Sequence, residues 1–183
     1  MERRANEIIE GAGTSRAPRD ELWAGNQIRF AMARILENEG INRFLTLYRH
    51  NNTLTEKAHR LLGFYQYATN RYIPAAEHLM FAFLIQNTVL IDDIIRRQHD
   101  FTFTTLDDLM RHVLSRPALV EFIEETEYFR TAYYFSAALH ATGKTQPAMQ
   151  LWAFLARSSN AGVWGERARR NPTPFIERAL EMP

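Results

Sequence analysis

Cysteine is absent from the 183-residue chain. Disulfides, thiolate metal ligands, thiol nucleophiles and a cysteine-borne lipid anchor are therefore excluded. An excess of charge of one sign is also missing, because 22 basic residues balance 21 acidic residues. A broad basic face is not implied, so we do not expect nucleic acid as a partner.

Long apolar runs are missing as well. The longest stretches without a formal charge, 79–91 and 131–143, are far shorter than the roughly 20 apolar residues of a membrane-spanning helix. The first residues carry charges of both signs with no apolar segment behind them, unlike a secretory signal. We expect a soluble, cytoplasmic protein without a membrane span, with a flexible N-terminal arm over 1–19 and a single helical domain over 20–183.

Apolar residues in the chain recur mainly with the period of an α-helix. Leu54, Ala58, Leu61, Tyr65 and Ala68 recur at steps of three and four residues, so they share one face of a helix. The strict alternation of apolar and polar residues that is typical of a half-buried strand does not occur. The sequence therefore predicts an all-α fold.

Thr53 and Glu56 have the spacing of a capping box at the start of this helix. In a capping box the hydroxyl and the carboxylate each accept a hydrogen bond from a backbone N–H that lacks a partner within the helix. We therefore predict a capping role for Glu56.

Two segments of the chain match each other. Tyr72–Ala82 aligns with Thr145–Leu155 when Pro74 is placed on Pro147, 73 positions later. Proline suits the first turn of a helix, where its missing N–H is no loss. A separation of 73 is about twice a 34-residue helix-hairpin repeat plus a small insertion, so a degenerate unit is expected around 105–124.

The two matching segments and the helices before them resemble the tetratricopeptide repeat family. The residues that carry the resemblance are Leu62, Gly63, Asn70, Tyr72, Ala75 and Ala82 in the first unit and Gly143, Ala148 and Trp152 in the second. The chain departs from the family pattern at His59 and Ala132 (tryptophan in the family), Ser136 (glycine), Thr145 (aromatic) and Leu155 (alanine). The resemblance implies antiparallel helix hairpins stacked as a short TPR-like α-solenoid.

Small residues in these helices have a physical role whether or not the family applies. Gly63 costs a helix about 1 kcal/mol relative to alanine, but it lets a second helix approach closely. Ala75 and Ala148 would do the same from the partner helix, while Leu62 and Leu79 fill the space between. A generic antiparallel helical bundle is the alternative reading of the same residues.

The resemblance implies a function in protein binding. First helices of each unit line the concave side in that family, which places Lys57, Arg60, Phe64, Tyr67, Arg130, Tyr133 and His140 on a partner-binding surface. Arginine can bind carboxylates with two parallel hydrogen bonds, and aromatic rings give rigid apolar contact. We therefore predict a non-enzymatic adaptor or scaffold that binds a partner peptide or helix, with a structural homo-oligomer as the alternative.

Signals for enzymatic chemistry are weak. Asp92-Asp93 resembles part of the aspartate-rich stretch of helical prenyl diphosphate synthases, but Arg96 and Arg97 stand at the following turn, where a further Asp is needed to hold Mg²⁺. Glu56 and His59 give one Glu-x-x-His, whereas a di-iron bundle needs two. We predict no enzyme, no cofactor and no metal site, with a Mg²⁺-dependent diphosphate enzyme using Asp92 and Asp93 as the less favoured alternative.

Overall fold

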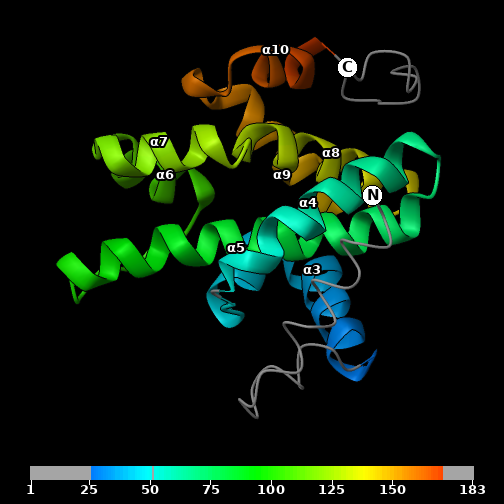
Figure 1. Ribbon diagram of the computed structural model, residues 1–183, viewed down its shortest axis with the longest axis horizontal. Coiled ribbons are helices and arrows are strands. Elements are labelled where there is room, and N and C mark those ends of the chain that lie inside the picture. Colours follow the sequence, from blue (N-terminus) through cyan, green and yellow to red (C-terminus); the bar gives the residue numbers. More distant parts are fainter. Residues whose placement is uncertain (1–25, 51, 171–183) are drawn as a thin grey trace.

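The computed structural model describes residues 26–50 and 52–170, and every regular element within them is a helix (Figure 1). The predicted all-α class is therefore confirmed for the described residues, while the predicted arm over 1–19 lies outside them. The helices are α3 (Asn26–Leu47), α4 (Thr53–Ala68), α5 (Tyr72–Arg97), α6 (Leu106–Leu114), α7 (Pro117–Glu125), α8 (Tyr128–Ala141), α9 (Thr145–Arg157), the 3-10 turn η1 (Ser159–Ala161) and α10 (Gly162–Arg170).

Two helix hairpins form the centre of the molecule. Helix α4 packs on α5, α9 packs on α8, and α8 lies directly against α5 with a smaller contact to α4. Helix α10 covers α9 and α8 on one side, and α3 contacts α9 and α5 on another (Figure 1). Helix α8 is consequently buried over most of its length, as expected of a helix with neighbours on several sides.

The turns of the two hairpins share three backbone hydrogen bonds at matching positions. Asn70 and Gly143, 73 positions apart, both have left-handed backbones, with φ of 61° and 82°. This conformation ends a helix by letting later N–H groups reach back to its last carbonyls. The matching bonds include Thr69 N to Tyr65 O and Thr142 N to Ala138 O (3.1 Å each), and Arg71 N to Gln66 O (2.8 Å) and Lys144 N to Leu139 O (2.9 Å).

Gly63 marks the closest approach of α4 to α5. A Cβ atom built on Gly63 would lie 2.4 Å from Leu79 Cγ and 3.2 Å from the backbone N of Leu79. Ala75 and Ala148 are fully buried at the corresponding turns of α5 and α9. Gly63 therefore stands where α4 and α5 nearly touch, and the two alanines lie in the core.

Helices α6 and α7 do not form a third unit between the two hairpins. They occupy the predicted region around 105–124, and α6 begins with Thr105, whose hydroxyl accepts a hydrogen bond from Asp108 N at 3.2 Å. Because α8 packs directly on α5, the α6–α7 pair lies beside this contact, over the C-terminal half of α5 (Figure 1). A helix pair thus lies where the sequence predicts a degenerate unit, but it is beside the direct contact between α5 and α8.

Helix α4 has an unusual distribution of polar residues. On the apolar face predicted from its periodicity, Leu54 is 79% and Tyr65 43% exposed, Leu61 and Ala68 are half-buried, and Ala58 is buried. On the inner side, Glu56 and Arg60 are buried. The helix already includes Thr53, and the Glu56 carboxylate binds the Arg60 and Gln86 side chains, so the predicted capping role of Glu56 is wrong.

Helix α5 is long and apolar enough to span a membrane, judged by length and composition alone. Within the qualifying window, however, 72% of the residues are buried inside the molecule. Buried core helices pass the same criterion, so α5 is weak evidence for a membrane span.

Candidate binding groove

The predicted partner-binding residues divide into open and buried positions. Lys57 is exposed, and Tyr67 and Arg130 are partly exposed. Arg60, Phe64 and Tyr133 are buried, with exposed fractions of 6%, 6% and 1%. Their burial corrects the placement of these three side chains on an open surface.

Arg60 is occupied by two carboxylates. Its Nε donates to Glu56 Oε1 at 2.9 Å, and its Nη1 pairs with Glu127 Oε2. Glu56 Oε1 also accepts from Gln86 Nε2 at 2.7 Å, and Gln86 in turn donates to Thr126 O at 2.8 Å. Burial raises the pKa of Glu56 against the opposing effect of Arg60.

This buried polar network joins α4, α5 and the start of α8. Glu127 has a left-handed backbone, with φ of 48°, which is uncommon for a residue other than glycine. Its carboxylate also accepts from Arg130 Nη1 at 2.6 Å. The network therefore fixes the sharp turn between α7 and α8 against the first hairpin.

Aromatic side chains complete the same junction. The Arg130 guanidinium lies 4.6 Å from the centre of the Phe64 ring, within the range of a cation–π contact. Tyr134 packs against both Phe64 and Tyr67, with ring centres 5.4 and 5.1 Å apart. Four predicted residues (Arg60, Phe64, Tyr67 and Arg130) are thus brought together, but they hold α4 to α8.

The other two predicted residues of α8 lie apart from this junction. Tyr133 packs against Trp164 of α10, with ring centres 5.5 Å apart. His140, which is partly buried, packs against Trp152 of α9 at 5.3 Å. Both therefore contribute to contacts between α8 and the helices behind it.

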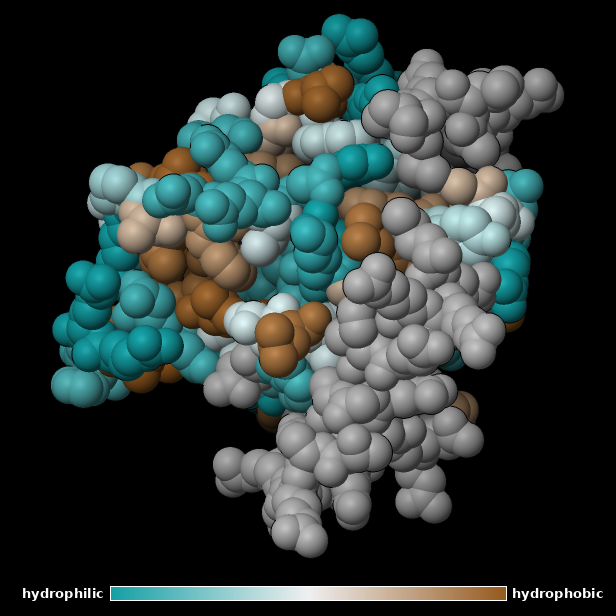
Figure 2. Space-filling view, viewed as in Figure 1, coloured by the Kyte–Doolittle hydropathy of each residue, from teal (hydrophilic) through white to brown (hydrophobic). Residues whose placement is uncertain are grey.

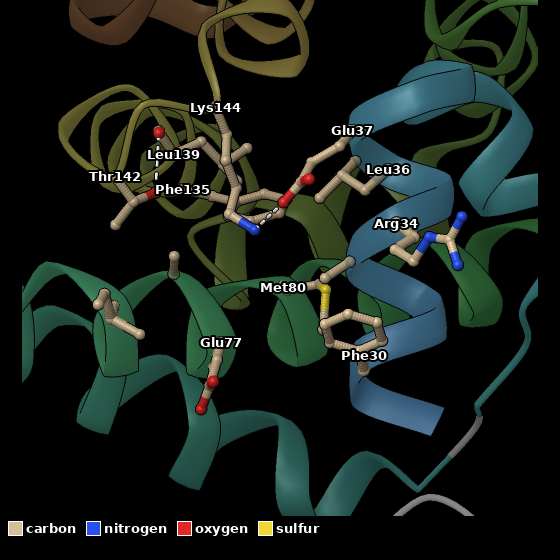
Figure 3. Close-up of a pocket in the computed structure, with 13 residues that line it drawn as sticks. Phe30, Arg34, Leu36, Glu37, Glu77, Met80, Phe135, Leu139, Thr142 and Lys144 are labelled. Atoms are coloured by element: carbon tan, nitrogen blue, oxygen red, sulfur yellow. Dashed lines mark hydrogen bonds and ion pairs between the residues drawn. The ribbon is translucent and has the colours of Figure 1, made fainter. Parts of the chain in front are cut away.

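An open groove lies elsewhere, between α3, α5 and the C-terminal end of α8 (Figure 3). Its volume of about 410 Å³ is within the range of small-molecule and side-chain pockets. The lining residues are Phe30, Ala33, Arg34, Leu36, Glu37, Ile73, Ala76, Glu77, Met80, Phe135, Leu139, Thr142 and Lys144.

The groove has a buried apolar floor and an exposed apolar rim. Leu36, Met80 and Phe135 are almost completely buried, whereas Phe30 is 68% and Ile73 67% exposed. Large apolar side chains open to water beside a cavity are typical of binding surfaces. Figure 3 shows Phe30 and Met80 facing one another from α3 and α5.

Charged side chains frame the groove. Lys144, after α8, forms an ion pair with Glu37 of α3 and closes one end. Arg34 and Glu77 point outward from α3 and α5 on different sides of the groove (Figure 3). The groove thus presents an apolar centre between a cation and an anion.

The alternative magnesium site has arginines around it. Asp93 Oδ2 lies 3.5 Å from Arg116 Nη1 and 3.4 Å from Arg97 Nε. Burial lowers the pKa of Arg49, and the negative charge of Asp92 opposes this effect. These cations compete with a metal ion for the carboxylates. Among the described residues, no group of three or more histidine or acidic side chains could hold a metal ion.

Sequence reasoning missed the groove because it depends on how α3 packs. One local signal was present: Phe30, Ala33, Arg34 and Glu37 fall at steps of three, one and three residues, which places them on one helix face. No protein-family model, curated protein or solved structure matches the chain. The resemblance to tetratricopeptide repeats consequently stays a prediction from the residues quoted for it.

Proposed function

We propose that this protein is a non-enzymatic adaptor that binds an apolar-anchored segment of a partner protein in the groove between α3, α5 and α8. The observation that carries the proposal is the pairing of exposed Phe30 and Ile73 with a floor of buried apolar side chains. A bulky apolar side chain inserted there would remove both exposed residues from water, which favours binding by roughly 25 cal/mol per Å² of apolar area.

Charge selects the kind of segment. Arg34 on one flank suits an acidic residue, and Glu77 on another suits a basic residue. Complementary charges at the rim contribute more to association rate and orientation than to affinity. The partner segment therefore has a central apolar anchor between residues of opposite charge.

We also propose that the two hairpins represent a degenerate TPR-like arrangement. The matching turns at Asn70 and Gly143, the contact at Gly63 and the packing of α8 on both α4 and α5 support this. The proposed groove differs from the family's usual surface, because it is formed by α5 and α3 together with α8. None of the seven partner-binding residues predicted from the sequence lines this groove.

Selection of short displayed peptides on the full chain tests the function. We expect enriched sequences with a bulky apolar or aromatic residue between an acidic and a basic one. Binding of a labelled peptide, followed by fluorescence anisotropy, should weaken at least tenfold, or about 1.4 kcal/mol, in Ile73→Glu. Val163→Glu is the matched control, since Val163 is 52% exposed on α10, away from the groove.

Two results would overturn the proposal. Selection that enriches no peptide leaves the groove without the proposed ligand. Enriched peptides whose affinity is unchanged by Ile73→Glu bind at another surface.

A further inference from the structure

The outward face of α4 is apolar, and two of its large side chains are open to solvent: Leu54 is 79% and Tyr65 43% exposed, while Leu61 and Ala68 are half-buried. Leu54, Leu61, Tyr65 and Ala68 fall at steps of seven, four and three residues on this face, together with the exposed Lys57. The acidic residue of α4, Glu56, is on the buried side. Figure 2 shows hydrophobic side chains interrupting the hydrophilic surface over the N-terminal half of α4.

The residues of this face are complementary to themselves when two copies of α4 lie antiparallel. If a two-fold axis passes through Leu61, the large Leu54 lies opposite the small Ala68 of the other copy. Lys57 then lies opposite Tyr65, where an ammonium group over the ring gives a cation–π contact. The two lysines are about 12 Å apart along the axis, which is beyond the Debye length at physiological salt.

We infer that α4 is a docking surface for a second copy of this chain, which it binds antiparallel with Leu61 on the two-fold axis. An isologous interface of this kind uses the same patch on both copies. One helix face covers less than the roughly 800 Å² per partner of a standard interface. The association is therefore reversible and concentration-dependent, and it leaves the groove between α3 and α5 open.

Because the chain has no cysteine, single cysteines report the arrangement directly. Under mild oxidation, Leu61→Cys should form a disulfide-linked dimer, since facing residues on the axis come within the short Cα separation that a disulfide needs. Leu54→Cys alone should not, because its two copies are about 21 Å apart along the helices. A mixture of Leu54→Cys with Ala68→Cys should again give dimers.

Val163→Cys on α10 is the control for random collision. Cross-linking of Leu61→Cys no faster than this control overturns the inference. Cross-linking of Leu54→Cys to itself indicates parallel helices and overturns the proposed axis. If a selected helical peptide that contains cysteine forms a disulfide with Leu61→Cys while the chain stays monomeric, the α4 face binds a different protein and the inference is wrong.

Sedimentation equilibrium of the full chain gives an independent measurement. Wild type should show a monomer–dimer equilibrium, and Leu61→Arg should weaken it at least tenfold by placing two like charges on the axis. Val163→Arg should leave it unchanged. Wild type that remains monomeric up to millimolar concentration overturns the inference, whatever the outcome of peptide binding at Ile73.

Discussion

The two hairpins share their turns and differ in their interiors. Asn70 and Gly143 end α4 and α8 with the same hydrogen bonds, and Ala75 and Ala148 are equally buried in the helices that follow. Yet Arg60 of α4 lies in an ionic network, whereas Tyr133, 73 positions later, packs against Trp164. The turn is thus set by local sequence, while the interior is set by what packs against each helix.

Position in the molecule explains this difference. Helix α8 contacts α4, α5, α7, α9 and α10, so apolar and aromatic residues suit nearly all of its sides. Helix α4 lies at an edge, with α5 and α8 on one side and an open apolar face on the other. Helix α4 is therefore apolar on its outer face and ionic on its inner face, which is the arrangement that suits a further partner bound to the outer face.

Removing one member of the ionic network should have the largest effect. Arg60→Met leaves the buried Glu56 carboxylate without its cation, and such uncompensated charges typically cost about 3–5 kcal/mol. We expect this loss in the free energy of unfolding measured by urea denaturation. The double variant Arg60→Met/Glu56→Gln should recover part of it, because the buried charge is then gone.

Arg43→Met is the matched control, since Arg43 forms an exposed pair with Glu39 four residues earlier. Its effect should stay within about 0.5 kcal/mol. Equal losses at Arg60 and Arg43 would contradict the contrast between an ionic junction and a solvated ion pair.

The helix contact at Gly63 should give the next largest effect. In Gly63→Ala the new methyl group meets Leu79, whose side chain and backbone are both fixed in the core, and overpacking of this kind costs about 1–3 kcal/mol. The gain in helix propensity, about 1 kcal/mol, offsets part of it. We expect a net loss in thermal and urea denaturation.

Ser136→Ala in α8 is the corresponding change in the second hairpin. Ser136 is buried and donates to Tyr133 O at 2.7 Å, so the substitution removes one hydrogen bond and adds no atoms. Its cost should be about 1 kcal/mol or less. If Gly63→Ala proves stabilising, the close approach of α4 to α5 is not what requires glycine.

Local features of the fold were predictable from the sequence. Gly63, Asn70 and Gly143 were recognised because backbone conformation and helix contact depend on residues within a few turns. The orientation of α4 was not predictable, since periodicity identifies an apolar face without saying what covers it. Leu54 and Tyr65 share the predicted helix face, and both are exposed.

The candidate site was harder to predict because it depends on distant residues. Glu56 appeared to be a helix cap, but its partner Gln86 is 30 residues away and Glu127, which shares Arg60, is 67 residues from that arginine. The groove likewise needs α3 to pack on α5, with Phe30 and Ile73 on the same rim. Pairings across such separations leave no mark in the local spacing of residues.

The pH dependence of stability gives the smallest effect and the finest test of the ionic interior. Burial raises the pKa of Glu56 in the folded state, so that state holds the proton more tightly than the unfolded chain does. Glu56 therefore contributes most to stability below its ordinary pKa, and that contribution is lost as pH rises through the raised value. Glu56→Gln keeps the acceptor for Arg60 and Gln86 but does not titrate. The free energy of unfolding of wild type minus that of Glu56→Gln should consequently grow as pH falls from 7 to 4.

The control is Glu121→Gln, a substitution at an exposed position of α7, measured over the same pH range. A difference for Glu56 that shrinks with falling pH would mean that attraction to Arg60 outweighs burial. In that case the interior of α4 would be a net stabilising ion pair. The α4–α5 hairpin would then gain stability from its polar interior, as the α8–α9 hairpin gains stability from aromatic packing. The open face of α4 would be the feature that most clearly distinguishes the two hairpins.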